Sequence, residues 1–174
     1  IYYSAGDVIF RAGDESDCMY DICDGCVGIY SDYRTENEKL LAELYAEAER
    51  GNADIVLCDY HEETAEGCLY RVQKPSSTAP STIIKEVLPG KLMGVLWNKL
   101  IRHELYTKHD VHFIPGINHC EDVLVCSQLL LNDISVVYLP AAFYHYDTRN
   151  MSSITRNYTE ATYRMRKRYI EALQ

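Results

Sequence analysis

Two adjacent carboxylates, Glu121 and Asp122, are the residues of this 174-residue chain best suited to chemistry. They follow the polar segment 115–120 and precede an apolar stretch, so they stand at a loop-to-helix junction. Carboxylates at such a junction can cap the helix or interact with the positive end of its dipole. A carboxylate aimed into a cleft can instead act as a general base, which accelerates a reaction by about 10²–10⁴-fold. The spacing alone favours the structural role.

Two further polar groupings have a functional and a structural interpretation. His145, between two tyrosines, is followed by Arg149 and Ser152-Ser153, and such side chains can hold a diphosphate or belong to an ordinary turn. Trp97 is the single tryptophan and stands two residues before Lys99. The structural alternative for this pair is a helix with a half-buried Trp and a solvated Lys.

Metal-like spacings are present but incomplete. Cys18, Cys23 and Cys26 follow the C-x4-C-x2-C spacing of part of an iron–sulfur site, which needs a fourth Cys, and Cys58 is distant. We therefore interpret them as small apolar residues. Four histidines within residues 103–119 match no compact zinc pattern, so we expect surface histidines.

Charge and composition exclude several classes of protein. The net charge of −9 argues against binding to nucleic acid or to broad anionic surfaces; only the tail after residue 147 is basic. The sequence contains no run of 18 apolar residues, so it predicts no membrane span, and the first residues lack a secretory signal pattern. The chain has seven Cys, and this odd number favours free thiols in a reducing compartment. We expect a cytoplasmic chain, with a peripheral position at the inner membrane face as an option.

The elements that must position these residues follow from hydrophobic periodicity. The pattern predicts a short antiparallel β meander over residues 6–33 and a polar loop over residues 61–82. Helices are expected over 36–50, 92–108, 121–132 and 158–173. Strands are expected over 54–58, 135–139 and 143–146, the last two being separated by Pro140. The predicted fold class is α/β.

Residues 44–174 resemble the C-terminal half of a family 2 glycosyltransferase, of the type that builds bacterial surface polysaccharides. Four stretches in matching order carry the resemblance: Leu44-Tyr45 to Ala53-Asp54-Ile55-Val56-Leu57-Cys58-Asp59-Tyr60, Leu96-Trp97-Asn98-Lys99-Leu100-Ile101, Gly116-Ile117 to Glu121-Asp122, and Tyr144-His145-Tyr146 to Ser152-Ser153-Ile154.

The resemblance implies a partial GT-A fold, a Rossmann-like α/β/α sandwich, and an inverting sugar transfer from a nucleotide-sugar to a glycan or lipid-linked acceptor. By resemblance, Asp122 is the catalytic base with Glu121 beside it, and a divalent cation, Mg²⁺ or Mn²⁺, neutralises the departing diphosphate.

The same resemblance assigns substrate-binding roles and a metal site. Trp97 and Lys99 would line the acceptor or diphosphate side, His145 would face the metal or diphosphate, and Arg149 would lie on the loop above. The family's N-terminal half, with its Asp-x-Asp metal motif, does not fit into the residues before Leu44. Asp32 is the one acid near the expected place, so the metal site is incomplete.

Residues 1–43 resemble the start of a cyclic-nucleotide-binding domain, a β jelly roll. The matching residues are Gly6-Asp7-Val8-Ile9-Phe10, Gly13-Asp14-Glu15-Ser16-Asp17, Met19-Tyr20-Asp21-Ile22, Gly25, Val27 and Ile29-Tyr30. The phosphate-binding cassette of that family is absent from the sequence.

The two resemblances meet between about residues 36 and 45. We therefore interpret the chain as a chimera of two incomplete domains, 1–43 and 44–174. The alternatives are a degenerate glycosyltransferase, a fragment of a cyclic-nucleotide-binding regulatory module, and a non-catalytic scaffold. Unpaired strand edges would favour a homo-oligomer.

Overall fold

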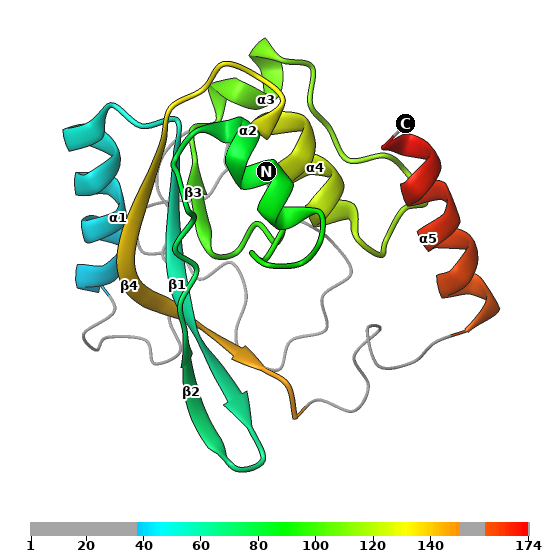
Figure 1. Cartoon of the computed structure of the whole chain (residues 1–174), viewed down its shortest axis with the longest axis horizontal. Coiled ribbons are helices and arrows are strands. Elements are labelled where there is room, and N and C mark those ends of the chain that lie inside the picture. The colour runs from blue at the N-terminus through cyan, green and yellow to red at the C-terminus, as the bar shows by residue number, and fades with distance from the viewer. Residues whose placement is uncertain (1–37, 150–158, 174) are drawn as a thin grey trace, which may run out of the picture.

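The computed structural model describes residues 38–149 and 159–173, which form a mixed α/β unit (Figure 1). The predicted meander over 6–33, and Asp32 with it, lies outside the described residues. The elements follow one another as α1 (Glu38–Gly51), β1 (Ile55–Thr64), β2 (Gly67–Arg71), α2 (Pro80–Val87), β3 (Lys99–Ile101), α3 (Glu104–Lys108), α4 (Glu121–Leu130), β4 (Val136–Asp147) and α5 (Glu160–Ala172). The α/β class predicted from the sequence is confirmed. No helix in the described part is both long and apolar enough to cross a bilayer.

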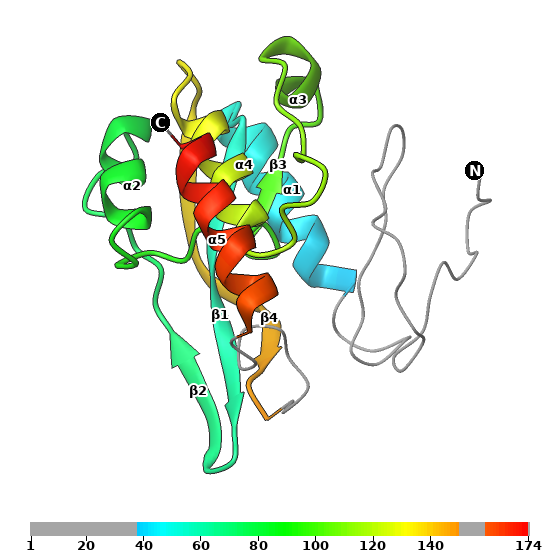
Figure 2. The ribbon, with the colours of Figure 1, turned by 90° about the vertical axis from the view of Figure 1, so that its right-hand side faces the viewer.

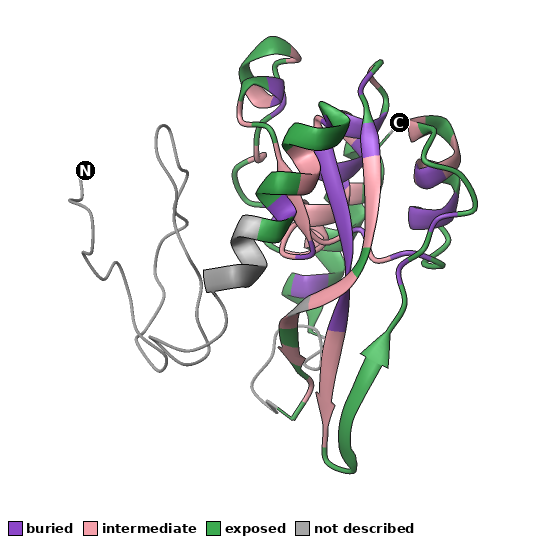
Figure 3. Cartoon of the chain, turned by 90° about the vertical axis from the view of Figure 1, so that its left-hand side faces the viewer, coloured by how far each residue is buried: buried purple, intermediate pink, exposed green. Residues whose placement is uncertain are grey.

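Strand β1 is the centre of a four-stranded sheet. Along one edge it pairs in parallel with β4, and along the other it pairs antiparallel first with β3 and then with β2. The first half of β1 is buried throughout and apolar except for Asp59, as expected for a strand covered on both faces (Figure 3). Its second half forms a hairpin with β2, whose five residues are all exposed, and this hairpin extends beyond the helices (Figure 2).

Helices cover both faces of the sheet. On one face, Leu44 of α1 packs against a small core that contains Ala53, Val56 and Cys58. On the other face lies the larger core, which combines residues of β1 and β4 with residues of α2, α3 and α4: Ile55, Ile83, Val87, Leu92, Leu105, Val111, Val125, Cys126, Leu129, Leu130, Ile134 and Val136. The alternation of side chains along β1 therefore assigns neighbouring residues to different cores.

The helices α1, α4 and α5 confirm the helices predicted from periodicity over 36–50, 121–132 and 158–173. The helix predicted over 92–108 is wrong, because this segment contains β3 and the short α3. Asn98 explains the difference. Its carbonyl accepts a hydrogen bond from the Cys58 N–H, and its amide donates to the Cys58 carbonyl, so the segment is bound to β1. Tertiary contacts here override a helical apolar pattern.

The loop predicted over 61–82 is only partly correct. Residues 61–64 continue β1, residues 67–71 form β2, and α2 starts at Pro80, where the missing N–H of proline costs nothing. The hairpin could not be recognised from apolar alternation, because all five residues of β2 are exposed.

The two strands predicted around Pro140 are one strand, β4. Its register against β1 jumps from Cys58↔Leu139 to Asp59↔Ala142, so Pro140 falls inside a β-bulge. A bulge leaves backbone groups out of the ladder, so a residue without an N–H is tolerated there.

Candidate functional site

The carboxylates Glu121 and Asp122 occupy the first turn of α4. Cys120 precedes them in a left-handed conformation, with φ 65°, and makes no side-chain cap. The Asp122 carboxylate accepts a hydrogen bond from the Leu96 backbone N–H. Burial, together with the charge of Glu121, raises the pKa of Asp122 above its ordinary value. Asp122 thus connects α4 to the loop before β3 and stays half-buried rather than solvated.

Lys99 is not the solvated lysine of the structural alternative. Its ammonium donates to the Met93 carbonyl at 3.0 Å, to the Val95 carbonyl at 2.5 Å and to Asn98 Oδ1 at 2.8 Å. An ammonium has three donors, so the protein itself occupies all of them. Burial lowers the pKa of Lys99, and the nearby charge of Asp122 opposes this shift. Lys99 therefore supports the loop 93–98 and lies near Asp122.

Trp97, on the same loop, is the centre of an aromatic cluster. It stacks on Tyr144 with ring centroids 4.4 Å apart and on Tyr146 at 5.4 Å, and meets Tyr60 edge-on at 5.0 Å. Burial raises the pKa of Tyr144, and the charges of Tyr146 and Asp122 add to this effect. The aromatic cluster and Asp122 thus belong to one neighbourhood.

A pocket of about 350 Å³ opens beside Glu121. Apart from Glu121 it is lined by Phe113, Ile114, Pro115, Ile117 and Asn118, the loop that leads into α4. Helix α5 holds this loop from outside, because the Arg168 guanidinium donates to the carbonyls of Pro115 and Gly116. The pocket therefore presents a carboxylate at the edge of an apolar wall.

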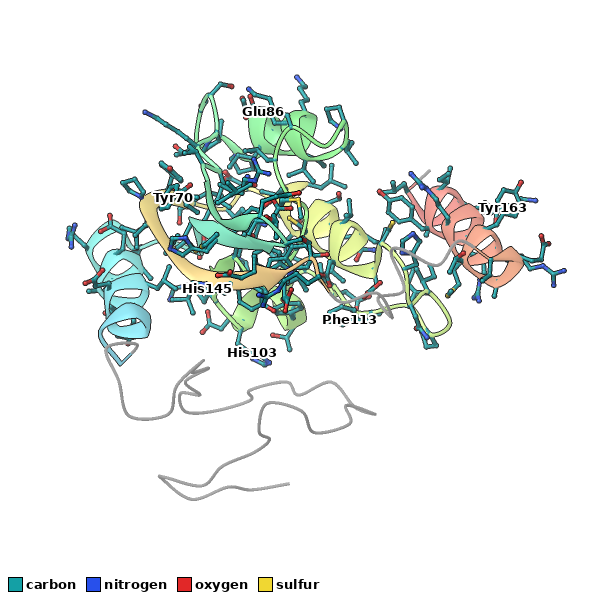
Figure 4. The ribbon with its side chains drawn as sticks, turned by 90° about the horizontal axis from the view of Figure 1, so that it is seen from below. Tyr70, Glu86, His103, Phe113, His145 and Tyr163 are labelled. Atoms are coloured by element: carbon teal, nitrogen blue, oxygen red, sulfur yellow. The ribbon has the colours of Figure 1, made fainter. Side chains whose placement is uncertain are left out.

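His145 lies on β4, away from Asp122, Lys99 and Trp97. His145 pairs with His61 in the ladder, between the pairs Tyr60↔Tyr144 and Glu62↔Tyr146. Since side chains alternate along a strand, His145 points to the face opposite the one where Tyr144 and Tyr146 contact Trp97. Figure 4 marks His145 on β4. Of the predicted site residues, the structure brings together Asp122, Lys99 and Trp97, and assigns His145 to the other face.

Arg149 is engaged by a neighbouring acid. Its guanidinium donates to both carboxylate oxygens of Asp147, at 2.9 and 3.0 Å, and this pairing lowers the pKa of Asp147 to about 2. Both side chains are about half exposed, so the pair contributes little to stability.

His145 belongs to a cluster on the exposed hairpin. Its Nδ1 lies 2.7 Å from Glu63 Oε1, and this hydrogen bond holds the pKa of Glu63 below its ordinary range. Hydrogen bonding to Glu63 raises the pKa of the Cys68 thiol. One ligand atom from each of Glu63, Cys68 and His145 lies within 4.8 Å of the other two.

The residues in the described ranges do not fit a Mg²⁺ or Mn²⁺ site. Mg²⁺ requires oxygen ligands in near-octahedral geometry, whereas the one cluster of three ligands within 38–149 and 159–173 includes a thiol and an imidazole. Asp122 and Glu121 belong to no such cluster there. The predicted Mg²⁺ or Mn²⁺ site therefore stays a prediction that needs ligands from other residues, Asp32 among them.

Sequence reasoning assigned no role to Asp59, which the structure buries to 1% exposure. Its carboxylate accepts hydrogen bonds from the hydroxyls of Tyr70 and Tyr138 and from the Gln73 N–H. Cys68 and Glu63 were also missed, since they lay in a presumed loop. An acid at the end of an apolar strand was the available signal for Asp59, but its donors come from distant segments.

Comparisons with known proteins agree with both resemblances. The family model of the cyclic nucleotide-binding domain matches residues 1–65, so the match continues through α1 into β1. The chain is 30% identical over 111 residues to a protein of Bacillus subtilis (strain 168) named "Putative glycosyltransferase EpsH", and the match covers 60% of this chain. The matched part spans about a third, 32%, of that relative's length. The chain is thus similar to two kinds of protein.

Proposed function

We propose that the described α/β unit is the acceptor-side part of a sugar-transferring protein that uses a nucleotide-sugar donor. The observation that carries the proposal is the position of Asp122: a half-buried carboxylate of raised pKa at the start of α4, beside an aromatic cluster. A general base works best when its pKa approaches the working pH, and burial moves Asp122 in that direction. The similarity to EpsH supports a sugar-related role.

Asp122 would take the proton of an acceptor hydroxyl. The hydroxyl oxygen forms a bond to the anomeric carbon of the donor, and the bond to the diphosphate breaks, with its electron pair leaving on the phosphate oxygen. Inversion follows because the attack comes from the face opposite the leaving group. Glu121, at the pocket, would contact the acceptor, and the aromatic cluster around Trp97 would offer apolar ring faces with polar tips to the sugar.

The direct test is transfer from a panel of nucleotide-sugars, with Mg²⁺ or Mn²⁺ supplied, to glycan and lipid-linked acceptors. Asp122→Asn keeps the shape and should lower the rate by about 10²–10⁴-fold. Glu121→Gln is the matched control and should change KM more than kcat. Transfer that survives Asp122→Asn unchanged would show that another group is the base.

A second candidate is a cyclic-nucleotide-binding module, and the family match over residues 1–65 favours it. Calorimetry with cyclic AMP and cyclic GMP distinguishes the two functions. We expect no heat of binding, because the phosphate-binding cassette is absent from the sequence. Saturable heat with either nucleotide would favour the second candidate.

The outer edge of β4 is one place where two copies of the chain could pair strand to strand. Among the described strands β4 pairs only with β1, so its other edge is available. Pro140 and the bulged register interrupt that edge, and both features oppose strand addition. We therefore expect any dimer to use a different strand edge, which cross-linking followed by mass spectrometry would locate.

A further inference from the structure

Three strands bring four metal-binding side chains together on the exposed hairpin. We call Glu63, Cys68, His145 and His61 the hairpin cluster. Glu63 and His61 stand two residues apart on β1 and so share a face, and the ladder pairs Glu63 with Cys68 and His61 with His145. Directly opposed side chains lie on the same face of a sheet. The register therefore determines that all four side chains meet.

The distances agree with the register. His145 Nδ1 lies 2.7 Å from Glu63 Oε1, Cys68 Sγ lies 3.6 Å from His61 Nδ1, and the two imidazole rings stack with centroids 4.6 Å apart. Ligand atoms of Glu63, Cys68 and His145 lie within 4.8 Å of one another. With metal–ligand bonds of about 2.0–2.3 Å, tetrahedral zinc ligands are separated by roughly 3–4 Å. Small side-chain rotations would bring the distances between these ligand atoms into that range.

The kinds of ligand decide between metals. A thiol and an imidazole are soft or intermediate ligands, which suit Zn²⁺, whereas Mg²⁺ and Ca²⁺ select oxygen. Cys68 is exposed, and the side chains of His145 and Glu63 are 49% and 23% exposed, so an ion can enter from solvent. The hairpin cluster therefore combines zinc ligands with an open route.

We propose that the hairpin cluster binds one Zn²⁺ through Cys68, His145 and Glu63, with His61 or a water as the fourth ligand. The site joins β1, β2 and β4 near the end of the hairpin, so zinc stabilises a part of the sheet that little apolar packing supports. The inference is separate from the proposed sugar transfer, because Asp122 and Trp97 take no part in it.

The test uses the untagged 174-residue chain with Co²⁺ as a spectroscopic probe for Zn²⁺. Cys18, Cys23 and Cys26 are first replaced by Ser, since their spacing could also hold a metal. In this background we expect one Co²⁺ per chain, a thiolate-to-cobalt charge-transfer band in the near ultraviolet, and its loss when one equivalent of Zn²⁺ is added. Millimolar Mg²⁺ should leave the band unchanged.

Single substitutions then assign the ligands. Cys68→Ser should abolish the band, and His145→Ala and Glu63→Gln should weaken Zn²⁺ binding by at least about tenfold. Cys120→Ser is the matched control, because Cys120 is partly exposed but distant in sequence from the hairpin, and it should retain the band. Circular dichroism of each metal-free variant confirms folding.

Two results would overturn the proposal: a band that persists in Cys68→Ser, or Zn²⁺ affinity that changes less than twofold in both His145→Ala and Glu63→Gln. Failure of sugar transfer in the same protein would leave this result unaffected, so the two proposals are tested independently.

Discussion

Replacing Asp59 with Ala tests the network that fixes the hairpin to the rest of the sheet. The carboxylate accepts from the Tyr70 hydroxyl at 2.7 Å, the Gln73 N–H at 2.5 Å and the Tyr138 hydroxyl at 2.9 Å. Tyr70 is 49% exposed and can bind water instead, but Gln73 is buried and its N–H would lose its partner. The Tyr138 hydroxyl is partly buried, so we count its bond and that of Gln73 as lost without replacement.

A hydrogen bond to a charged group contributes about 1.5–3 kcal/mol. The loss of two such bonds leads us to expect that Asp59→Ala lowers the free energy of unfolding by about 3–6 kcal/mol. With an m-value of about 2 kcal/mol/M, the urea midpoint should fall by roughly 1.5–3 M.

Urea titration followed by circular dichroism measures this shift. Tyr138→Phe removes one of these donors at nearly constant volume and should cost about 1.5–3 kcal/mol. Asp133→Ala, at an exposed acid, is the matched control and should stay within about 0.5 kcal/mol of the parent. If Asp59→Ala costs less than Tyr138→Phe, the network does not hold the hairpin and our reasoning is refuted.

Three further predictions concern other contacts. Asn98→Ala should destabilise the protein by about 1–3 kcal/mol in the urea titration, because the Cys58 carbonyl loses its buried donor. The fluorescence of Trp97 in the folded variant should also shift to longer wavelength. Gly94→Ala should cost about 1–3 kcal/mol in the same titration, since an added Cβ would lie 2.9 Å from Val123; an unchanged midpoint would contradict this close approach. Hydrogen bonds from Lys91 and Ser76 lower the pKa of Glu86 from 4.5 to about 2, so its contribution to stability is present above about pH 4.5 and is lost as the pH falls toward 2. The melting temperature of Glu86→Gln should therefore lie below that of the parent at pH 7, with a smaller difference at pH 3; a difference independent of pH would rule out the linkage.

Local sequence was sufficient where an element depends on its own residues. Helices α1, α4 and α5 have apolar spacing and terminal signals within one segment, and all were predicted. The buried start of β1 was recognisable for the same reason, because a run covered on both faces is apolar at every position.

Pairing between distant segments could not be read from the chain alone. The helical pattern over 92–108 was overridden by the hydrogen bonds between Asn98 and Cys58, forty residues apart. The strand through Pro140 exists because a bulge against β1 accommodates the proline. The exposed β2 carries no apolar pattern, so only its ladder with β1 defines it.

The candidate site divides in the same way. The residue types alone predicted that Glu121 and Asp122 start a helix, and only the family resemblance connected Trp97 and Lys99 with them. Only the tertiary structure showed that the Lys99 ammonium donates all its hydrogen bonds to the loop 93–98 and that Asp122 is half-buried near Tyr144. It also showed that His145 lies beside Glu63 of the hairpin and not beside Asp122. The physical reason is that a side chain's direction follows from strand register, and register is a relation between segments, which no single segment contains.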